Sequence, residues 1–471
     1  MTVGIVGGGI AGLGAAYRLQ ERGHDVRIFE ASDDIGGLAA VHETSGDPIE
    51  KFYHHLSKTE ETIVELAADL GVGDRVEWIY GNDGYYVDGV VHPLNTIWEI
   101  AAYPHMSLYD KFRLGMLTME VDVRGGIPSF DTYDDLEAYE DVPIKEFLVE
   151  HTTRGVYENF FEPLLDAKFG DRKDDVSAAW LLGRIKFRGE RDLLKGEQLG
   201  YFDGSFAVLI DALVDAVGRE NVQTGARVVG LDETDSPASR VDETDAAATG
   251  EGDGRVDSLA VETADGRETH DVDSVIVAAM PNVLEDLTGY ACDVDFQGAV
   301  CAVVTMNRSL MDETYWLNVA HDAPFGALIE HTNFVPPERY GGDHLLYVAS
   351  YVQSPDEWLW QADDDAVETR WLDHIAEMFP EGFDEAMVDD VRVSRNPRAA
   401  PVYERGYLDM VVPYDVGATE GVPDGVYYAG MASRAQYPER SLNGGIVAGY
   451  ECADRIDDAP RTPDAVEVGN S

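Results

Sequence analysis

The chain has 471 residues, of which 90 are acidic and 35 basic, and its formal net charge is −55. Hydrophobic residues make up 44%, enough for sizeable cores, so a wholly disordered chain is excluded. This charge disfavours nucleic acid and anionic lipid as partners, because both are repelled. The acidic excess runs along the whole chain, and we interpret it as a halophilic surface whose self-repulsion is screened in molar salt. An ordinary acidic protein is the alternative.

Compartment signals favour a cytoplasmic protein. Cys292, Cys301 and Cys452 show neither a metal-binding spacing nor a disulfide framework, so we expect no metal site and a reducing environment. The first residues lack the basic start of a signal peptide. No stretch approaches the roughly 18 apolar residues of a transmembrane helix.

The first thirty residues predict the start of a βαβ unit. Residues 2–6 are a short apolar run, typical of a buried strand, and a glycine turn follows. Helical periodicity covers residues 10–22, and a second strand is expected over 25–30. Residues 59–71 then predict a helix with a threonine cap and a glycine stop.

The middle of the chain changes character. Aromatic-rich helices and loops are expected from about residue 76 to 200, and a further helix over 204–218. Two strand-like runs flank an Asp/Thr/Gly-rich stretch, 232–254, which we interpret as a surface hairpin loop. Residues 273–281 indicate a buried strand of the parallel type.

Alternating apolar patterns follow in residues 296–352 and 390–412, and they predict a second, more antiparallel sheet. Residues 425–430 are again typical of a buried strand, and a last helix starts at about Gly444. The tail after Asp458 is expected to be disordered.

Residues 7–12 read GGGIAG and place Gly7, Gly9 and Gly12 at the dinucleotide-binding spacing. The strand before, the helix after and Glu30 at the end of the next strand make this signal specific. Gly7 allows the tight turn, Gly9 lets the backbone approach a pyrophosphate on the helix N-terminus, and Gly12 lets the helix pack closely. Glu30 is expected to accept hydrogen bonds from the adenosine ribose.

Six residues after Glu30 come Gly36 and Gly37. With this pair the sequence resembles the FAD-binding superfamily of protoporphyrinogen oxidases, flavin amine oxidases, carotenoid desaturases and UDP-galactopyranose mutases. The strand that ends at Gly430 and the helix that starts at Asn443 match the C-terminal block of these families, where the helix N-terminus faces the flavin. The resemblance implies FAD as the cofactor.

The resemblance also implies the fold: α/β, with a glutathione-reductase-like Rossmann-type FAD-binding domain on a parallel sheet, interrupted by a mixed α+β substrate domain. We assign residues 1–75, 200–285 and 405–457 to the FAD-binding domain. Residues 76–199 and 286–404 are assigned to the substrate domain.

The block matches extend the expected FAD contacts beyond the fingerprint glycines. Val228 matches a strand position whose backbone contacts adenine, and ordinary strand core is the alternative. Two positions depart from many relatives, since Leu38 stands where they carry arginine and Met431 where they carry aspartate. The expected cofactor-binding set is Gly7, Gly8, Gly9, Ile10, Ala11, Gly12, Glu30, Ala31, Gly36, Gly37, Leu38, Val228, Gly430, Met431, Leu442, Asn443 and Gly444.

Candidate catalytic residues lie in two segments. A histidine segment lies beside the flavin in the mutases, and His54 falls at a comparable place here, with His55 adjacent. Either could tune the flavin or move a proton, or only pack at a loop. Tyr437 and Arg440 precede the flavin-facing helix and could face substrate or only fix the loop.

Half of the eight lysines lie between residues 168 and 195, together with several arginines. Such a cationic patch could bind carboxylates or a diphosphate of the substrate, and ion pairing with nearby acids is the alternative. The candidate substrate residues are Lys168, Arg172, Arg184, Lys186 and Arg188. No lysine follows Lys195, which disfavours the amine oxidase arrangement with a lysine from the second half of the chain.

Three functions remain open. The first is an FAD-dependent oxidoreductase that dehydrogenates a medium-sized organic substrate and passes electrons to oxygen, a quinone or a protein carrier. A redox-neutral flavoenzyme on a sugar nucleotide and a non-catalytic FAD-binding scaffold are the alternatives. Residues 92–118, with Trp98, Tyr103, Met106, Phe112 and Leu117, are a candidate for transient membrane contact, but a buried helical core is the expectation.

Overall fold

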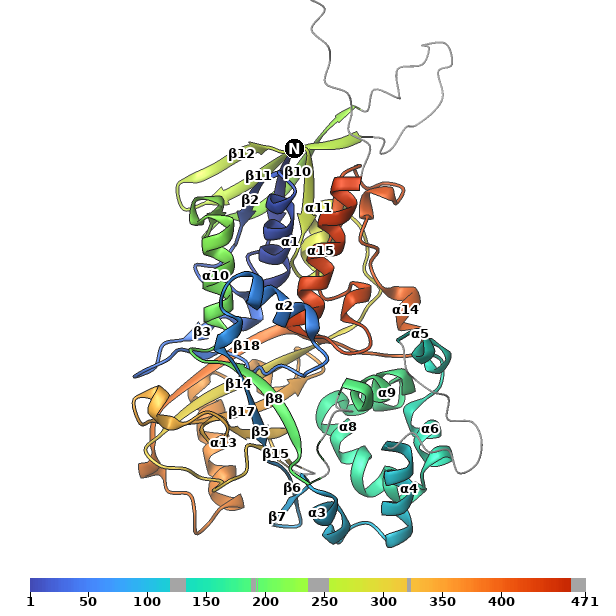
Figure 1. The fold of residues 1–471 in the computed structure, drawn as a ribbon, viewed down its shortest axis with the longest axis vertical. Coiled ribbons are helices and arrows are strands. Elements are labelled where there is room, and N and C mark those ends of the chain that lie inside the picture. The colour runs from blue at the N-terminus through green and yellow to red at the C-terminus, as the bar shows by residue number, and fades with distance from the viewer. Residues whose placement is uncertain (119–132, 188–191, 193, 236–253, 320–322, 459–471) are drawn as a thin grey trace, which may run out of the picture.

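The computed structural model describes residues 1–118, 133–187, 192, 194–235, 254–319 and 323–458 (Figure 1). The expected disordered tail and most of the predicted 232–254 loop lie outside these residues. The described part is elongated. A parallel sheet with its helices occupies one end of the long axis, and a second sheet and a helical lobe share the other end.

The parallel sheet has five strands in the order β19-β13-β1-β2-β9, and every neighbouring pair is parallel. Three of its strands, β1, β13 and β19, are short apolar runs in which nearly every residue is buried, as in parallel strands that other elements cover on both faces. The strands are β1 (Thr2–Val6), β2 (Asp25–Phe29), β9 (Val222–Gln223), β13 (Ser274–Val277) and β19 (Val426–Tyr428). This is the expected Rossmann-type arrangement.

Different elements cover the two faces of this sheet. One face packs against the helices α1 (Ile10–Glu21), α10 (Ala207–Val217) and α15 (Leu442–Asp458). The other face packs against an antiparallel sheet of β10 (Arg227–Asp235), β11 (Gly254–Thr263) and β12 (Gly266–Asp271). Leu259 of β11 lies so close to Gly4 that a Cβ on Gly4 would be 2.4 Å from its Cδ1, so a larger residue at this position would require the Leu259 side chain to shift.

Helices α1 and α15 pack side by side (Figure 1). A Cβ on Gly449 would lie 2.3 Å from the carbonyl oxygen of Ala11, so only a glycine permits this approach. Farther along the pair, Arg22 binds Asp454 at 2.6 Å and Asp457 at 3.4 Å. This contact brings the glycine loop before α1 and the loop before α15 to the same place.

The second sheet has seven strands in the order β18-β14-β17-β16-β15-β6-β7, and all pairs except β15 with β6 are antiparallel. It confirms the antiparallel sheet expected from residues 296–352 and 390–412, except that Tyr407–Met410 is a short helix, α14. The strands are β6 (Asp83–Val87), β7 (Val90–Pro93), β14 (Phe296–Met306), β15 (Trp316–Val319), β16 (Ala327–Glu330), β17 (His344–Val352) and β18 (Val388–Pro401). Helix α13 (Asp364–Met378) covers one face and buries Trp371.

The helical lobe lies beside the second sheet (Figure 1). It corrects one expectation for residues 92–118, because Trp98 and Phe112 are exposed, whereas Tyr103, Met106 and Leu117 are buried. An antiparallel pair, β5 (Val76–Gly81) with β8 (Glu197–Phe202), leads into and out of the lobe. The lobe helices are α3 (Ile97–Ala102), α4 (Leu108–Thr118), α5 (Tyr133–Leu136), α6 (Ile144–His151), α7 (Arg154–Val156), α8 (Glu162–Phe169) and α9 (Ala178–Phe187).

The remaining helices are α2 (Glu61–Asp69), α11 (Pro281–Thr288) and α12 (Trp358–Gln361). Among the helices that the structure describes, none combines the length and the apolar character needed to cross a membrane. The strands of the parallel sheet come from the beginning, the middle and the end of the chain, and the four domain boundaries proposed above remain predictions.

The net charge of −55 predicts that stability depends strongly on salt. We expect the thermal unfolding midpoint to rise by at least roughly 5 °C between low salt and molar KCl, because screening removes self-repulsion in the folded state. Circular dichroism melts at constant pH measure this. Sucrose at matched osmolality is the control, and an equal rise in sucrose and KCl would contradict the charge explanation.

Candidate cofactor and substrate site

Two glycines shape the loop between β1 and α1. Gly7 has a φ of +113°, and a Cβ there would lie 2.5 Å from the carbonyl oxygen of Ala278. A Cβ on Gly12 would lie 2.1 Å from the carbonyl oxygen of Gly7, so the first turn of α1 also needs a glycine. At both positions the need for glycine comes from contacts with other protein atoms.

Gly9 and Gly37 form an open cradle of bare backbone. The N–H of Gly36 donates to the carbonyl oxygen of Gly8 at 2.9 Å, which holds the two glycine segments together. A Cβ on Gly9 would meet only Gly37 within 4 Å, and a Cβ on Gly37 would meet only Gly9. Gly9 is also the N-cap of α1 and offers no capping side chain. An uncapped helix start beside side-chain-free backbone suits a phosphate group.

Glu30 is fixed beside this cradle. One carboxylate oxygen accepts the N–H of Gly8 at 2.8 Å, and the other accepts the N–H and hydroxyl of Ser32 at 2.9 Å. The carbonyl oxygen of Glu30 accepts the N–H of Ala226 at 2.8 Å. Val228 lies two residues after Ala226, near the start of strand β10, and its backbone is therefore close to Glu30. Its side chain packs in the core. Ala31 is exposed at the same edge.

The start of α15 is tied to the start of α2. The side-chain oxygen of Asn443 accepts the N–H of Ile63 at 2.8 Å, and the carboxylate of Glu60 accepts the N–H of Ser57 at 2.7 Å and that of Asn443. The expected threonine cap of α2 is therefore wrong, because Asn443 takes that role from the far end of the chain. Burial raises the pKa of Glu60.

The loop before α15 is held from the helical lobe and from the segment that follows β18. Tyr403 donates its hydroxyl to the carbonyl oxygen of Gln436 at 3.0 Å, and Tyr437 donates to a carboxylate oxygen of Glu140 at 2.5 Å. Tyr437 also stacks on Tyr407 with ring centroids 6.0 Å apart. These contacts favour the loop-fixing role for Tyr437. Gly430 and Met431 precede this loop at the end of β19.

Glu439 gathers two of the candidate substrate cations. Its carboxylate oxygens bind Nζ of Lys168 at 2.9 Å and Nη1 of Arg184 at 3.0 Å. Burial alone would raise the pKa of Glu439, but the two cations and Arg440 lower it to about 2. Lys168 is 14% exposed, and its Nζ lies 4.8 Å from the Trp180 ring. Burial lowers the pKa of Lys168, while Glu439 opposes this shift.

Arg440 joins the same cluster from the other side. Its guanidinium hydrogen-bonds the Tyr351 hydroxyl, which also bonds that of Tyr53. Nζ of Lys168 lies 5.9 Å from the Tyr351 ring centroid. Burial would raise the pKa of Tyr351, yet the positive charges of Lys168 and Arg440 lower it overall. Tyr351 is thus a phenol held between two cations.

His54 lies at the edge of this cluster as a neutral imidazole. Its Nδ1 lies 2.6 Å from the carbonyl oxygen of Phe52, so Nδ1 carries the proton and Nε2 is left as an acceptor. Desolvation and the charge of Arg440 lower the pKa of His54 to about 4. The His55 ring instead packs on Trp316, with centroids 6.1 Å apart.

The predicted cationic patch is divided in the structure. Lys168 and Arg184 meet at Glu439, whereas Arg172 binds Asp175, Asp295 and Glu404 at 2.9 to 3.1 Å. Arg188 and the side chain of Lys186 lie outside the described residues. Ion pairing, the alternative considered from the sequence, accounts for Arg172.

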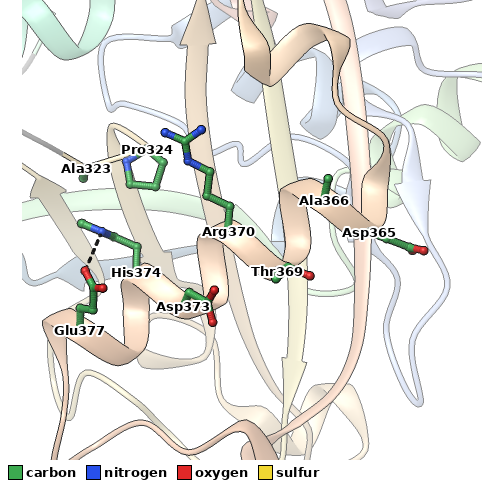
Figure 2. Close-up of a pocket in the computed structure, with 9 residues that line it drawn as sticks. All are labelled: Ala323, Pro324, Asp365, Ala366, Thr369, Arg370, Asp373, His374 and Glu377. Carbon is green, nitrogen blue, oxygen red and sulfur yellow. Dashed lines mark ion pairs between the residues drawn. The ribbon is translucent and has the colours of Figure 1, made fainter.

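A surface groove of about 800 Å³ lies elsewhere, along α13 (Figure 2). Acidic residues such as Asp365, Asp373 and Glu377 line it, and His374 pairs with Glu377 at 3.5 Å. None of the residues predicted from the sequence to bind cofactor or substrate lines this groove. The candidate site is therefore the glycine cradle together with the cluster around Glu439 and Arg440.

A family model described as flavin containing amine oxidoreductase matches residues 10–457, from the first residue of α1 to the last turn of α15. The chain belongs to this flavin-containing oxidoreductase family. FAD is accordingly its cofactor, and the residues fit the group: an uncapped helix start, bare glycine backbone and an anchored acid lie together, as a dinucleotide requires.

Individual relatives in this family are distant. A Mycobacterium tuberculosis protein named as a flavin-containing monoamine oxidase, AofH, is 25% identical over 197 residues, covering 41% of this chain and 42% of its own. The 15-cis-phytoene desaturase of Arabidopsis thaliana is 27% identical over 224 residues, covering 44% and 38%. The matches thus span less than half the length of these curated relatives.

Solved structures resemble the chain over nearly its full length. A protein titled as a protoporphyrinogen oxidase from Exiguobacterium sp. 255-15 has a TM-score of 0.72 at 17% identity, covering 97% of this chain and 98% of its own. A reduced UDP-galactopyranose mutase has a TM-score of 0.67 at 14% identity, covering 97% and 95%. At this identity the likeness shows the fold alone.

The cradle can be tested with a pair of glycine variants in α1. We expect Gly9→Ala to weaken FAD binding at least about tenfold while the fold persists, because the methyl group enters cofactor space and meets no protein atom closer than 3.9 Å. Gly14→Ala is the matched control, since its methyl group makes only ordinary contacts with Ile446 at 3.6 Å. The flavin-to-protein absorbance ratio is the readout, and equal FAD content in both variants would refute the cradle.

The proximity of Arg440 to His54 can be tested by NMR titration. Removing a nearby positive charge favours the charged imidazole, so Arg440→Gln should raise the pKa of His54 from about 4. It should stay below the ordinary 6.5, because desolvation is the larger cause. His42 is the internal control, since burial lowers its pKa and the charges of Lys51 and Arg392, not that of Arg440, lower it further. An unchanged His54 titration would show that the two groups are not close.

Proposed function

We propose that the chain is an FAD-dependent oxidoreductase that dehydrogenates a medium-sized organic substrate carrying an anionic group. The observation that carries the proposal is the cluster before α15, where Lys168, Arg184 and Arg440 surround a single carboxylate, that of Glu439. The three cations and the one carboxylate give these four side chains a net charge of +2. A carboxylate or phosphate of the substrate would balance that excess.

The contrast with the rest of the surface supports this assignment. The molecule carries a net charge of −55, and acids pair with Arg172 and Lys173 at several points of the lobe. Around Glu439 the balance is reversed, in half-buried surroundings where charges interact strongly. An acidic protein gains nothing in solubility from such an arrangement, so a ligand is the simpler explanation.

The chain's own residues would have three tasks. Arg440 and Lys168 bind the anionic end of the substrate, Tyr351 bridges them, and His54 offers Nε2 as a hydrogen-bond acceptor. The start of α15 lies next to Arg440 and would direct the positive end of its helix dipole toward negative charge. When bound, the flavin supplies hydride acceptance at N5. Oxygen, a quinone or a protein carrier would then take the electrons.

Relatives carry names from several chemistries, among them amine oxidation and desaturation. In the amine oxidase arrangement considered above, a lysine from the second half of the chain lies near the flavin. This sequence has no lysine in its second half, but Lys168 reaches the cluster from the first half. These names therefore support hydride removal from an organic substrate and leave its identity to experiment.

A redox-neutral reaction on a sugar nucleotide is the second candidate. The likeness to the reduced UDP-galactopyranose mutase favours it, and the same cations would suit a diphosphate. Such an enzyme needs reduced flavin but consumes no electrons, so turnover only after dithionite reduction distinguishes it from the first candidate.

The first test is an anaerobic spectrum in high-salt buffer. We expect flavin absorbance from the purified protein and bleaching by at least one carboxylated organic compound in a panel that includes the neutral ester of each acid. Oxygen and a soluble quinone are then offered to the bleached enzyme. A yellow protein that no compound bleaches, and that also fails with sugar nucleotides after dithionite, would leave only a scaffold role.

The cluster is tested with matched arginine variants and the substrate found by bleaching. We expect Arg440→Leu to lower kcat/KM for the acid at least about tenfold, and to change it little for the neutral ester, because only the acid loses a charged partner. Arg172→Leu is the control, since its guanidinium is bound by three carboxylates outside the cluster. Equal losses for acid and ester would contradict anion recognition.

A further inference from the structure

An apolar patch covers α3 and α4 at the end of the helical lobe. Five side chains form it, and we call it the α3–α4 patch: Ile97, Trp98, Leu108, Tyr109 and Phe112. Leu108 is 81% exposed, Trp98 70% and Phe112 54%. In the described part of the chain eight large apolar side chains are exposed, and five of them are these. Clustered apolar exposure of this kind marks an interaction surface.

The patch carries no exposed charge. Residues 97–118 contain two acids and two bases, although 90 of the 471 residues of the chain are acidic. Every residue in this range that is exposed is uncharged: Ile97, Trp98, Ala101, Ala102, Pro104, Ser107, Leu108, Tyr109, Phe112 and Thr118. The surface that surrounds the rest of the molecule with negative charge is interrupted here.

The four charged side chains are all turned to internal partners. Glu99 accepts the N–H groups of Asn95 and Thr96, each at 2.8 Å, and Asp110 accepts that of Ser107 at 3.0 Å. Lys111 donates to the carbonyl oxygen of Ala101 at 2.7 Å, and Arg113 donates to that of His151. These bonds cap α3, hold α4 to α3 and fix α4 to α6. The local charge is therefore balanced by the two helices themselves.

The exposed side chains of the patch do not contribute to the packing of the lobe. Tyr103, Met106, Leu114 and Leu117 are buried beneath the same two helices. Thr96 and Glu99 form a complete capping box at the start of α3. Both helices are thus anchored without help from Trp98, Leu108 or Phe112, and no element among the described residues covers these three side chains.

We propose that the α3–α4 patch docks the molecule on a lipid bilayer, with its aromatic and aliphatic side chains in the interfacial region. The patch lies at the end of the long axis opposite the parallel sheet, so it can reach a membrane without bringing the bulk of the acidic surface close (Figure 1). Tryptophan and tyrosine are the side chains that favour the headgroup level. Attachment is apolar rather than electrostatic, because the patch offers no free cation.

Charge also decides between a bilayer and a second copy of the chain. Another copy would bring a further net charge of −55 to the contact, whereas a zwitterionic bilayer brings no net charge. Asp88, which is 84% exposed on the neighbouring β6–β7 turn, borders the patch and would oppose both an acidic partner and anionic lipid.

Flotation with phosphatidylcholine vesicles tests the proposal on the full-length flavoprotein. We expect the protein to float with the vesicles, and equally well or better in molar KCl, because salt strengthens apolar contacts and screens repulsion. The double variant Trp98→Ser with Phe112→Ser should bind at least about tenfold more weakly, with unchanged flavin content. Trp358→Ser is the matched control, an exposed tryptophan on α12 outside the patch.

Three outcomes would overturn the proposal: no flotation of the natural chain, equal flotation of the double variant, or a dimer that the double variant abolishes without any vesicle binding. If the double variant does not fold, fluorescence quenching by vesicles of brominated phosphatidylcholine is measured instead. The bromines should quench the tryptophan fluorescence of the natural chain, because Trp98 is exposed in the patch, and this quenching should be lost or much weaker in Trp98→Phe. Equal quenching of both proteins would also overturn the proposal.

Discussion

The close contact of α1 with α15 is the constraint on which the rest of the site depends. Gly449 lets the backbones meet, and Gly14 lies against Ile446 at ordinary contact distance. The contact aligns two helix starts from opposite ends of the chain, one at the glycine cradle and one beside Arg440. Because the loop before α15 carries Glu439 and Arg440, the same contact also determines where the two cations of the lobe can meet a carboxylate.

Much of the fold was predictable because local sequence determines it. The strand over residues 2–6, the glycine turn and the helix from Ile10 were expected, and the structure has them. The alternation in residues 344–352 was also enough to predict an antiparallel strand, and it places Tyr347, Ala349 and Tyr351 on one face. Chemistry at Tyr351 could not be predicted, since its partners Lys168 and Arg440 come from other elements.

Little in the sequence indicated the role of residues whose partners lie far away along the chain. Glu439 is one acid among 90, and only the fold shows that Lys168 and Arg184 converge on it. Asn443 was expected as a cofactor contact, yet its side chain caps α2, a role that the spacing of 380 residues hides. The exposed aromatics of α3 and α4 were expected in a core, because an apolar helix pattern does not say whether any element covers it.

The tie between α2 and α15 has a consequence for how the protein matures. Glu60 and Asn443 each satisfy the start of the other's helix, so neither helix start is complete alone. During synthesis the first βαβ segment leaves the ribosome long before residues 442–458 exist. A nascent chain that ends before α15 lacks the Asn443 side chain that accepts the Ile63 N–H at the start of α2. Until residues 442–458 are made, the cofactor site therefore has only one of its two helix starts.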